Sequence, residues 1–357
     1  MNNNTGSNAE SKIDEGRVAP NSREPRLPYP DGWFVVAFSN DVRPGHVLRS
    51  HFMGEDIVIY RTASGLLRVC RPYCPHLGAH LGYGGRVDGE DIVCPFHHFA
   101  YSPSGACVRN EYGTPPPKAQ LTMLESREID GLALVWHHAR NHLPDWDIPG
   151  MQWNGYGLPA HSMHVLVDHP QEVMENSIDL GHLPTLHGFV AKPRKPIEFI
   201  GTCAELDYDL HPLRHLGGFL TSISLHVTAK LFGLGVIRTE FSRPKWKRPI
   251  VIWALPTSIN PRQIELRFMI ALPISSRNWP RPLREIGTYG IYHLTRAIAL
   301  PLLLRDVSKD FPVWQNKVYL EHPRLARGDG PIMRFRHWCS QFYSISTDVS
   351  AEPAPLA

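Results

Sequence analysis

Short apolar runs separated by glycine, proline and polar residues dominate the first part of the chain. The first run, at 32–39, carries Trp33 and Phe34 ahead of further apolar residues and predicts a β-strand. Further strands are expected at 57–60, 66–70, 92–93, 99–101, 106–108 and 132–136. Short strands with such punctuation are typical of a small all-β domain, which we place at 27–145.

The pattern changes in the second half, where longer apolar runs alternate with stretches of helical composition. A helix is expected at 170–181, and 287–317 is mostly helical in composition, with interruptions at Pro301 and Pro312. Strands are expected at 163–167, 219–232, 250–256 and 264–273. Strands flanked by helices predict an α+β domain at 146–345, built on an antiparallel sheet.

Composition agrees with two domains of a soluble protein. The chain has 357 residues, of which 42% are apolar and 20% charged, which is ordinary for globular proteins. The formal net charge of +3 is too small to indicate a nucleic-acid partner. Two of the six cysteines belong to a motif described below, and the others show no paired spacing, which indicates a reducing compartment.

No segment has the pattern of an export signal or a membrane span. Residues 1–26 are polar and lack the apolar centre of a signal peptide, so a disordered tail is expected there, and another at 346–357. The apolar run at 291–304 contains His293, Arg296 and Pro301 and is too short and polar to cross a bilayer. We therefore expect a cytoplasmic protein without a transmembrane segment, and peripheral contact with a membrane stays open.

The first candidate site combines Cys74-Pro75-His76 with Cys94-Pro95-Phe96-His97, which follows after seventeen residues. Each half offers one thiolate and one imidazole, the ligand set of a Rieske [2Fe-2S] cluster. A zinc site is the alternative, but paired zinc ligands are usually separated by two or more residues. The single residue between Cys74 and His76 therefore favours the cluster.

A second candidate site lies in the first helix of the α+β domain and just beyond it. Asp179 and His182 are three residues apart and would share one helix face. Pro184 disfavours a helical conformation before it, so the segment should bend there and bring His187 back toward His182. Two imidazoles and one carboxylate form the facial triad that holds non-haem Fe(II).

The carboxylate of this triad has three candidates. Asp179 is near in sequence, but Asp310, toward the end of the long helical region, is the preferred choice. Asp306 lies one helical turn earlier and is the fallback.

Together these motifs resemble the oxygenase component of Rieske non-haem iron oxygenases. The resemblance covers the chain between its tails and rests on the cysteine and histidine pairs, then Glu175-Asn176-x2-Asp179-x2-His182-x4-His187, then Asp310 with Trp314. The segments 313–317 and 328–343 resemble bacterial 3-ketosteroid 9-alpha-hydroxylases, and the chain is also similar to cholesterol 7-desaturases. Phe99 departs from the family, which often has Trp there.

The resemblance implies two metal cofactors and an oligomer. A [2Fe-2S] cluster would be held by Cys74, His76, Cys94 and His97, and a mononuclear Fe(II) by His182, His187 and Asp310. Asp179 would be the electron bridge between a neighbouring subunit's cluster and this iron. Such a bridge requires a head-to-tail ring, which the resemblance implies is a homotrimer.

The resemblance also implies the activity. The chain would be a terminal monooxygenase that uses O2 and electrons to hydroxylate, desaturate or demethylate a hydrophobic small molecule, steroid-like or polycyclic. It shows neither a dinucleotide-binding loop nor a plant-type ferredoxin motif, so a separate reductase, with or without a ferredoxin, would supply electrons from NAD(P)H. The alternatives are a Rieske electron carrier without oxygen chemistry and an oxygenase of small aromatic or secondary-metabolite substrates.

Overall fold

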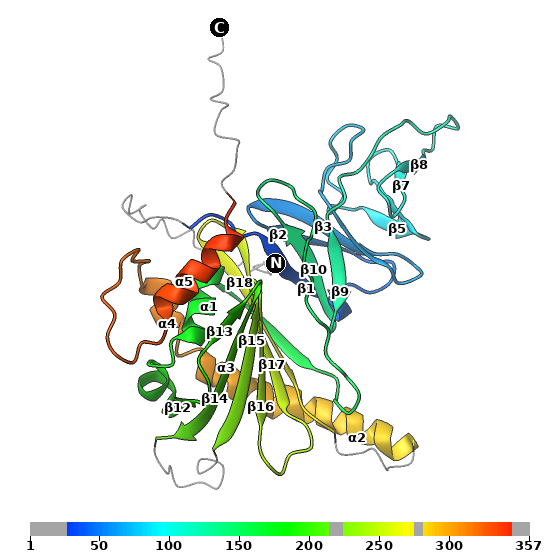
Figure 1. The fold of residues 1–357 in the computed structure, drawn as a ribbon. Coiled ribbons are helices and arrows are strands. Elements are labelled where there is room, and N and C mark those ends of the chain that lie inside the picture. Colours follow the sequence, from blue (N-terminus) through cyan, green and yellow to red (C-terminus); the bar gives the residue numbers. More distant parts are fainter. Residues whose placement is uncertain (1–26, 214–223, 275–280, 345–357) are drawn as a thin grey trace, which may run out of the picture.

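The computed structural model describes residues 27–213, 224–274 and 281–344. The first strands form three antiparallel sheets (Figure 1). The sheet β1-β10-β9 comprises β1 (Gly32–Phe38), β9 (Ser126–Ile129) and β10 (Leu132–His137), and the sheet β2-β3-β4 comprises β2 (Val47–Phe52), β3 (Glu55–Arg61) and β4 (Leu67–Cys70). The sheet β5-β6-β7-β8 comprises β5 (Arg86–Asp88), β6 (Asp91–Val93), β7 (Ala100–Tyr101) and β8 (Cys107–Arg109). The predicted all-β character of this domain is confirmed.

Strand β1 is buried along its whole length because both of its faces are covered. Phe34 packs in one apolar cluster with residues of β3 and β4. Trp33 and Val35, whose side chains point the other way, pack with Trp253 and its neighbours in the second domain. A continuous apolar interface therefore joins the two domains through β1.

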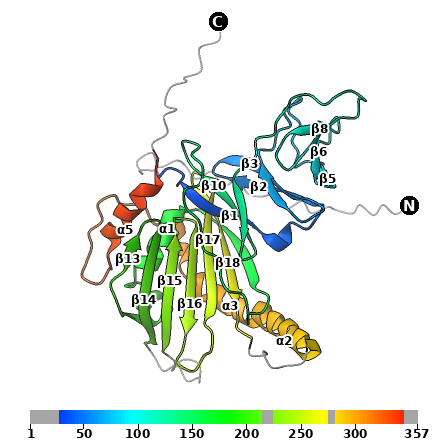
Figure 2. The same ribbon diagram turned by 45° about the vertical axis from the view of Figure 1, so that its right-hand side comes forward.

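The second domain is built on one large antiparallel sheet with the order β11-β18-β17-β16-β15-β14-β12, and β13 pairs with β14 (Figure 2). Its strands are β11 (Ala160–Leu166), β12 (Phe189–Pro193), β13 (Glu198–Ile200), β14 (Cys203–Pro212), β15 (Leu225–Phe232), β16 (Val236–Ser242), β17 (Ile250–Asn260) and β18 (Gln263–Ala271). The predicted antiparallel sheet with flanking helices is therefore confirmed.

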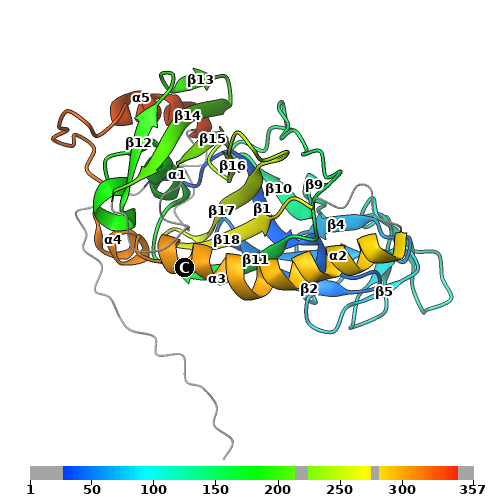
Figure 3. The same ribbon diagram turned by 90° about the horizontal axis from the view of Figure 1, so that it is seen from below.

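Helices cover the face of this sheet that turns away from the N-terminal domain (Figures 1 and 3). Seen from below, α2 and α3 run as one rod along the sheet, and α1, α4 and α5 lie at its far end. The elements are α1 (Pro170–Ile178), α2 (Arg281–Leu294), α3 (Leu300–Val307), α4 (Phe311–Asn316) and α5 (Ile332–Cys339), with π-turns at Leu183–His187 and Thr295–Ala299 and 3-10 turns at Ser39–Asp41 and Ser340–Phe342. Buried residues of α1, α4 and α5 share one apolar core with the sheet.

Several boundaries differ from those predicted. The helix expected at 170–181 ends at Ile178, and the helical region expected from residue 287 begins at Arg281. Strands β14 and β16 were not predicted, although charged residues such as Asp207 and Arg238 alternate with apolar ones there, as in a half-buried strand. The strand expected at 219–232 is observed as Leu225–Phe232, and 219–223 and both expected tails lie outside the described residues.

The helical region is interrupted near Pro301, as expected: a π-turn at Thr295–Ala299 directly precedes α3, whose second residue is Pro301. Proline cannot donate a backbone hydrogen bond, and the wider turn accommodates that loss within one continuous rod. Among the described residues, no helix combines the length and apolar character needed to cross a membrane.

Candidate metal centres

The candidate cluster ligands lie on two loops of similar conformation at the tip of the N-terminal domain. In the first loop the amide of Gly78 donates to the carbonyl of Cys74 at 2.9 Å. In the second, the amide of His98 donates to the carbonyl of Cys94 at 3.2 Å. Gly78 and His98 both have positive φ, 74° and 53°, so each loop turns back at the same point after its cysteine.

These loops bring all four candidate ligands together. The Cys74 and Cys94 side chains are buried, and the rings of His76 and His97 lie 4.9 Å apart. Burial raises the pKa of the Cys94 thiol, and hydrogen bonding to Cys74 adds to the rise, while the amides of Phe96 and His97 oppose it. Nδ1 of His97 is buried without a hydrogen-bond partner. A buried ring nitrogen without a partner, in the loop that also carries Cys94, suits a metal-bound histidine, so these residues fit a [2Fe-2S] cluster.

Aromatic residues surround these ligands on both their inner and outer sides. The Phe99 ring stacks on His76 at 4.1 Å, and the Tyr101 hydroxyl is 3.0 Å from Sγ of Cys74. Outside, the tip exposes large apolar side chains: Tyr73, Leu77, Tyr83, Phe96 and Tyr112. The tip therefore presents an apolar surface immediately around the candidate cluster.

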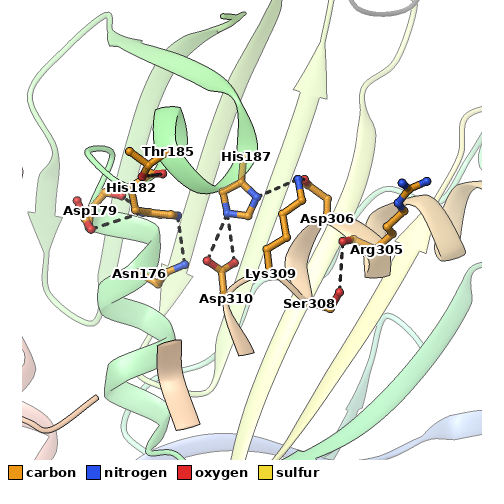
Figure 4. A network of polar contacts seen from close by, with 10 residues as sticks. All are labelled: Asn176, Asp179, His182, Thr185, His187, Arg305, Asp306, Ser308, Lys309 and Asp310. Carbon is orange, nitrogen blue, oxygen red and sulfur yellow. Dashed lines mark hydrogen bonds and ion pairs between the residues drawn. The ribbon is translucent and has the colours of Figure 1, made fainter. Parts of the chain in front are cut away.

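The second site forms where α1 ends and the π-turn begins (Figure 4). The turn starts after His182, contains Pro184 and ends at His187, so the bend expected at the proline is present. It places the rings of His182 and His187 5.3 Å apart. Asp310, at the start of α4 and only 4% exposed, completes a group whose ligand atoms lie within 4.8 Å of one another.

Asp179 and Asp306 hold the outer nitrogens of the two imidazoles, Asp179 through its main-chain carbonyl and Asp306 through its carboxylate. Nδ1 of His182 lies against the Asp179 carbonyl and 3.5 Å from its carboxylate. Nδ1 of His187 is 3.1 Å from the Asp306 carboxylate, while its Nε2 is 3.3 Å from Asp310. Each Nε2 thereby points to the centre of the group, the arrangement by which outer partners orient metal-bound histidines.

Of the three candidate carboxylates, the structure brings only Asp310 into the group with His182 and His187. Asp306, the fallback, contacts the far nitrogen of His187 instead, and Asp179 likewise lies on the outer side of His182. Two imidazoles and one buried carboxylate are the ligands of a 2-His-1-carboxylate Fe(II) site, so these three residues fit such a metal.

The two carboxylates determine the charge of His187. Burial by itself lowers the pKa of His187, but hydrogen bonds and charge interactions with Asp306 and Asp310 outweigh it and raise the pKa to about 9. Burial raises the pKa of Asp306 in turn, and its contacts with His187 and Lys309 outweigh that effect and lower it. In the metal-free protein, the two carboxylates on either side of His187 therefore favour its protonated form, the imidazolium.

Two supporting interactions were not predicted from the sequence. Asn176 lies 3.4 Å from Nε2 of His182. Glu175, on the same helix, forms a buried double hydrogen bond with Arg336 of α5, at 2.6 and 2.8 Å. The Glu175-Asn176 pair was visible in the motif, but its partner lies 161 residues away and no local pattern indicates it.

Two family models match the chain along most of its length. The Rieske [2Fe-2S] domain matches residues 32–123, and the 3-Ketosteroid 9alpha-hydroxylase C-terminal domain matches residues 135–343. The second match spans more than half of the chain. Each covers one of the two candidate sites.

Individual proteins agree with these matches. Cholesterol 7-desaturase nvd of Drosophila melanogaster is 29% identical, covering 91% of this chain and 77% of the relative. The Rhodococcus rhodochrous protein named "Probable 3-ketosteroid-9-alpha-monooxygenase, oxygenase component" is 24% identical, covering 91% of this chain and 82% of its own. The crystal structure of dicamba monooxygenase has the same fold at 15% identity, with a TM-score of 0.66 over 88% of this chain and 97% of that one. The chain is a Rieske-type oxygenase and belongs to the family with the 3-ketosteroid 9α-hydroxylase C-terminal domain.

Proposed function

We propose that this oxygenase oxidises a steroid-like or polycyclic hydrophobic molecule, using mononuclear Fe(II) on His182, His187 and Asp310. The observation that carries the proposal is the convergence of these three side chains, within 4.8 Å, in a chain that also has a Rieske domain. Cys74, His76, Cys94 and His97 would hold the [2Fe-2S] cluster. When bound, the iron supplies dioxygen activation and the cluster supplies single electrons.

The protein's own residues orient and insulate these groups. Asp306 and Asp310 fix the His187 ring from both sides, so that one nitrogen faces the metal. The Asp179 carbonyl does the same for His182. Asp310 is buried, which keeps bulk water away from one side of the site.

The steroid-like substrate class is supported by the relatives, whose names specify cholesterol and 3-ketosteroid. Half-buried apolar side chains between the sheet and α3, including Ile252 and Leu303, are compatible with a hydrophobic substrate. Hydroxylation, desaturation and demethylation would all use the same ligands.

A panel of sterols, ketosteroids and small aromatics, incubated with a surrogate reductase and NAD(P)H, tests the proposal by mass spectrometry of the products. We expect oxidation of a steroid and no product from the His187→Ala variant, which should lose iron but keep the cluster's visible absorption. The proposed substrate class is wrong if the enzyme, fully loaded with iron and cluster, oxidises a small aromatic molecule but no steroid. If Asp310→Ala keeps full activity, the chain uses no iron at this site.

We further propose a head-to-tail homotrimer in which Asp179 connects one subunit's iron to its neighbour's cluster. Figures 1 and 2 place the β5–β8 tip and α1 on opposite sides of the chain, which is unfavourable for transfer within one subunit. The Asp179 side chain is 34% exposed and borders a recess of about 180 Å³ that also includes Asn176 and Leu325. This recess could receive the apolar tip of another copy.

Co-expression of His97→Ala with His187→Ala tests the ring. Each variant lacks one centre, so either alone should be inactive, whereas a mixed ring should pair an intact cluster with an intact iron and regain part of the activity. A monomer in analytical ultracentrifugation, or no regain in a mixed ring, would contradict it. Electrons would come from a separate reductase, with or without a ferredoxin, in the cytoplasm.

A further inference from the structure

The rod formed by α2, the π-turn and α3 is apolar on two opposite sides. Its inner side is buried: Thr295 and Leu300 are covered, and Leu303 and Leu304 pack against the sheet beside Ile250. Its outer side exposes four large apolar side chains. These are Tyr289 at 65%, Leu294 at 44%, Ile298 at 52% and Leu302 at 60% exposure. A helix of a globular protein normally turns polar residues outward, so the outer side requires its own explanation.

The outer apolar residues form two neighbouring rows rather than scattered positions. Leu294, Ile298 and Leu302 follow one another at intervals of four residues, which places them along one side of a helix. The His293 ring contacts Tyr289 at 4.3 Å, and these two residues form a neighbouring row on α2. We call these five residues the outer stripe. Large exposed patches of this kind mark surfaces that contact another apolar phase or protein.

Within the stretch of the rod that carries the outer stripe, the charged residues have one sign. From Thr288 to Leu304 the sequence contains no aspartate or glutamate, and Arg296 and Arg305 are exposed on the rod. The next acidic residue, Asp306, is already paired with Lys309 and His187. An apolar row flanked by arginines, without acidic residues, complements the anionic surface of a lipid bilayer.

The position of the rod leaves the outer stripe accessible. In Figure 1, α2 lies at the lower right of the molecule and α3 lies behind the sheet, whereas the β5–β8 tip and α5 lie in the upper half. The proposed contacts between subunits use that tip and the recess beside Asp179. The outer stripe shares no residue with that tip or with the lining of that recess.

We propose that the outer stripe docks this oxygenase on the surface of an anionic bilayer, with the rod lying in the headgroup region. A lipid surface fits because the apolar residues would contact the acyl chains, while the arginines would contact the anionic headgroups. The proposal concerns binding alone and does not depend on which molecule the enzyme oxidises.

Vesicle flotation tests the proposal with the full chain carrying both metal centres. Vesicles of phosphatidylcholine alone are compared with vesicles in which about one lipid in three is phosphatidylglycerol. We expect binding to the anionic vesicles, and a loss on the order of tenfold or more in the double variant Ile298→Glu/Leu302→Glu. The charge variant Arg296→Glu should bind anionic vesicles more weakly than the wild-type enzyme does.

The matched control is Ile200→Glu, which alters another exposed isoleucine, on β13 and 68% exposed. It should bind vesicles like the wild-type enzyme, and the visible spectrum and thermal unfolding of every variant should be unchanged because the altered residues are exposed. The proposal is overturned if the wild-type enzyme stays with neither kind of vesicle, or if Ile200→Glu reduces binding as much as the stripe variant does. A stripe variant that changes the oligomer mass in ultracentrifugation while vesicle binding persists would also overturn it, because the stripe would then contact another subunit.

Discussion

Iron binding to the metal-free enzyme should release a proton from His187. A metal ligand must be a neutral imidazole, yet Asp306 and Asp310 raise the pKa of His187 to about 9 in the metal-free protein. At pH 7, two units below that pKa, only about one molecule in a hundred carries neutral His187. Binding should therefore release about one proton per iron, and the apparent affinity should rise roughly tenfold per pH unit between pH 7 and 9.

Anaerobic calorimetry in two buffers of different ionisation enthalpy measures this proton directly. The informative variant is Asp306→Asn, which removes the carboxylate 3.1 Å from Nδ1. It should lower the pKa of His187, so that fewer protons are released at pH 7. It should also weaken iron binding by about 10- to 100-fold at pH 9, where proton competition no longer contributes, because Nδ1 loses its orienting acceptor.

The matched control is Asp207→Asn, which removes the carboxylate of another aspartate–histidine pair, 2.9 Å from His226. Proton release and iron affinity should match those of the wild-type enzyme. This prediction is refuted if the wild-type enzyme releases no proton on binding iron at pH 7, or if Asp306→Asn releases as many protons as the wild-type enzyme. In either case the neighbouring carboxylates do not control the charge of His187.

Three further outcomes are expected. Replacing Arg336 by Ala should destabilise the protein by about 3–5 kcal/mol in urea unfolding, because Glu175 would stay buried without its partner; an unchanged midpoint would show that α5 does not anchor α1. Replacing Tyr101 by Phe should lower the reduction potential of the cluster in voltammetry, since the hydroxyl 3.0 Å from the Cys74 sulfur is lost; an equal or higher potential would contradict this. Replacing Gly235 by Ala should destabilise the domain interface in thermal unfolding, because the new Cβ would lie 2.1 Å from a carbonyl of β1; an unchanged melting temperature would show that the contact relaxes freely.

The candidate cluster residues could be predicted from the sequence because each half of the motif is local. The cysteine and histidine of each pair lie one or two residues apart, so a single turn suffices to orient both. The bend at Pro184 was likewise predictable, since proline restricts the residue before it. Both features depend on backbone geometry within a few residues.

The geometry between His187 and Asp310, the preferred third candidate ligand, could not be derived in this way. Asp310 lies 123 residues from His187, and their contact depends on how α4 packs against the π-turn. The sequence shows that Asp306 and Asp310 are four residues apart. It does not show which nitrogen of His187 each carboxylate contacts. That assignment follows from the orientation of the ring between the two carboxylates, a property of the packed structure.

The exposure of the outer stripe could not be predicted from the sequence, for a different reason. Apolar residues occur on every side of the helical segment 291–304, alongside His293 and Arg296, so the sequence alone does not tell which side the sheet will cover. Once Leu300 and Leu304 pack inward, Ile298 and Leu302 must face outward, because residues on opposite sides of one helix cannot share a face. Burying the inner side therefore leaves the outer residues without a role in the folded core, and the lipid contact that we propose would give them one.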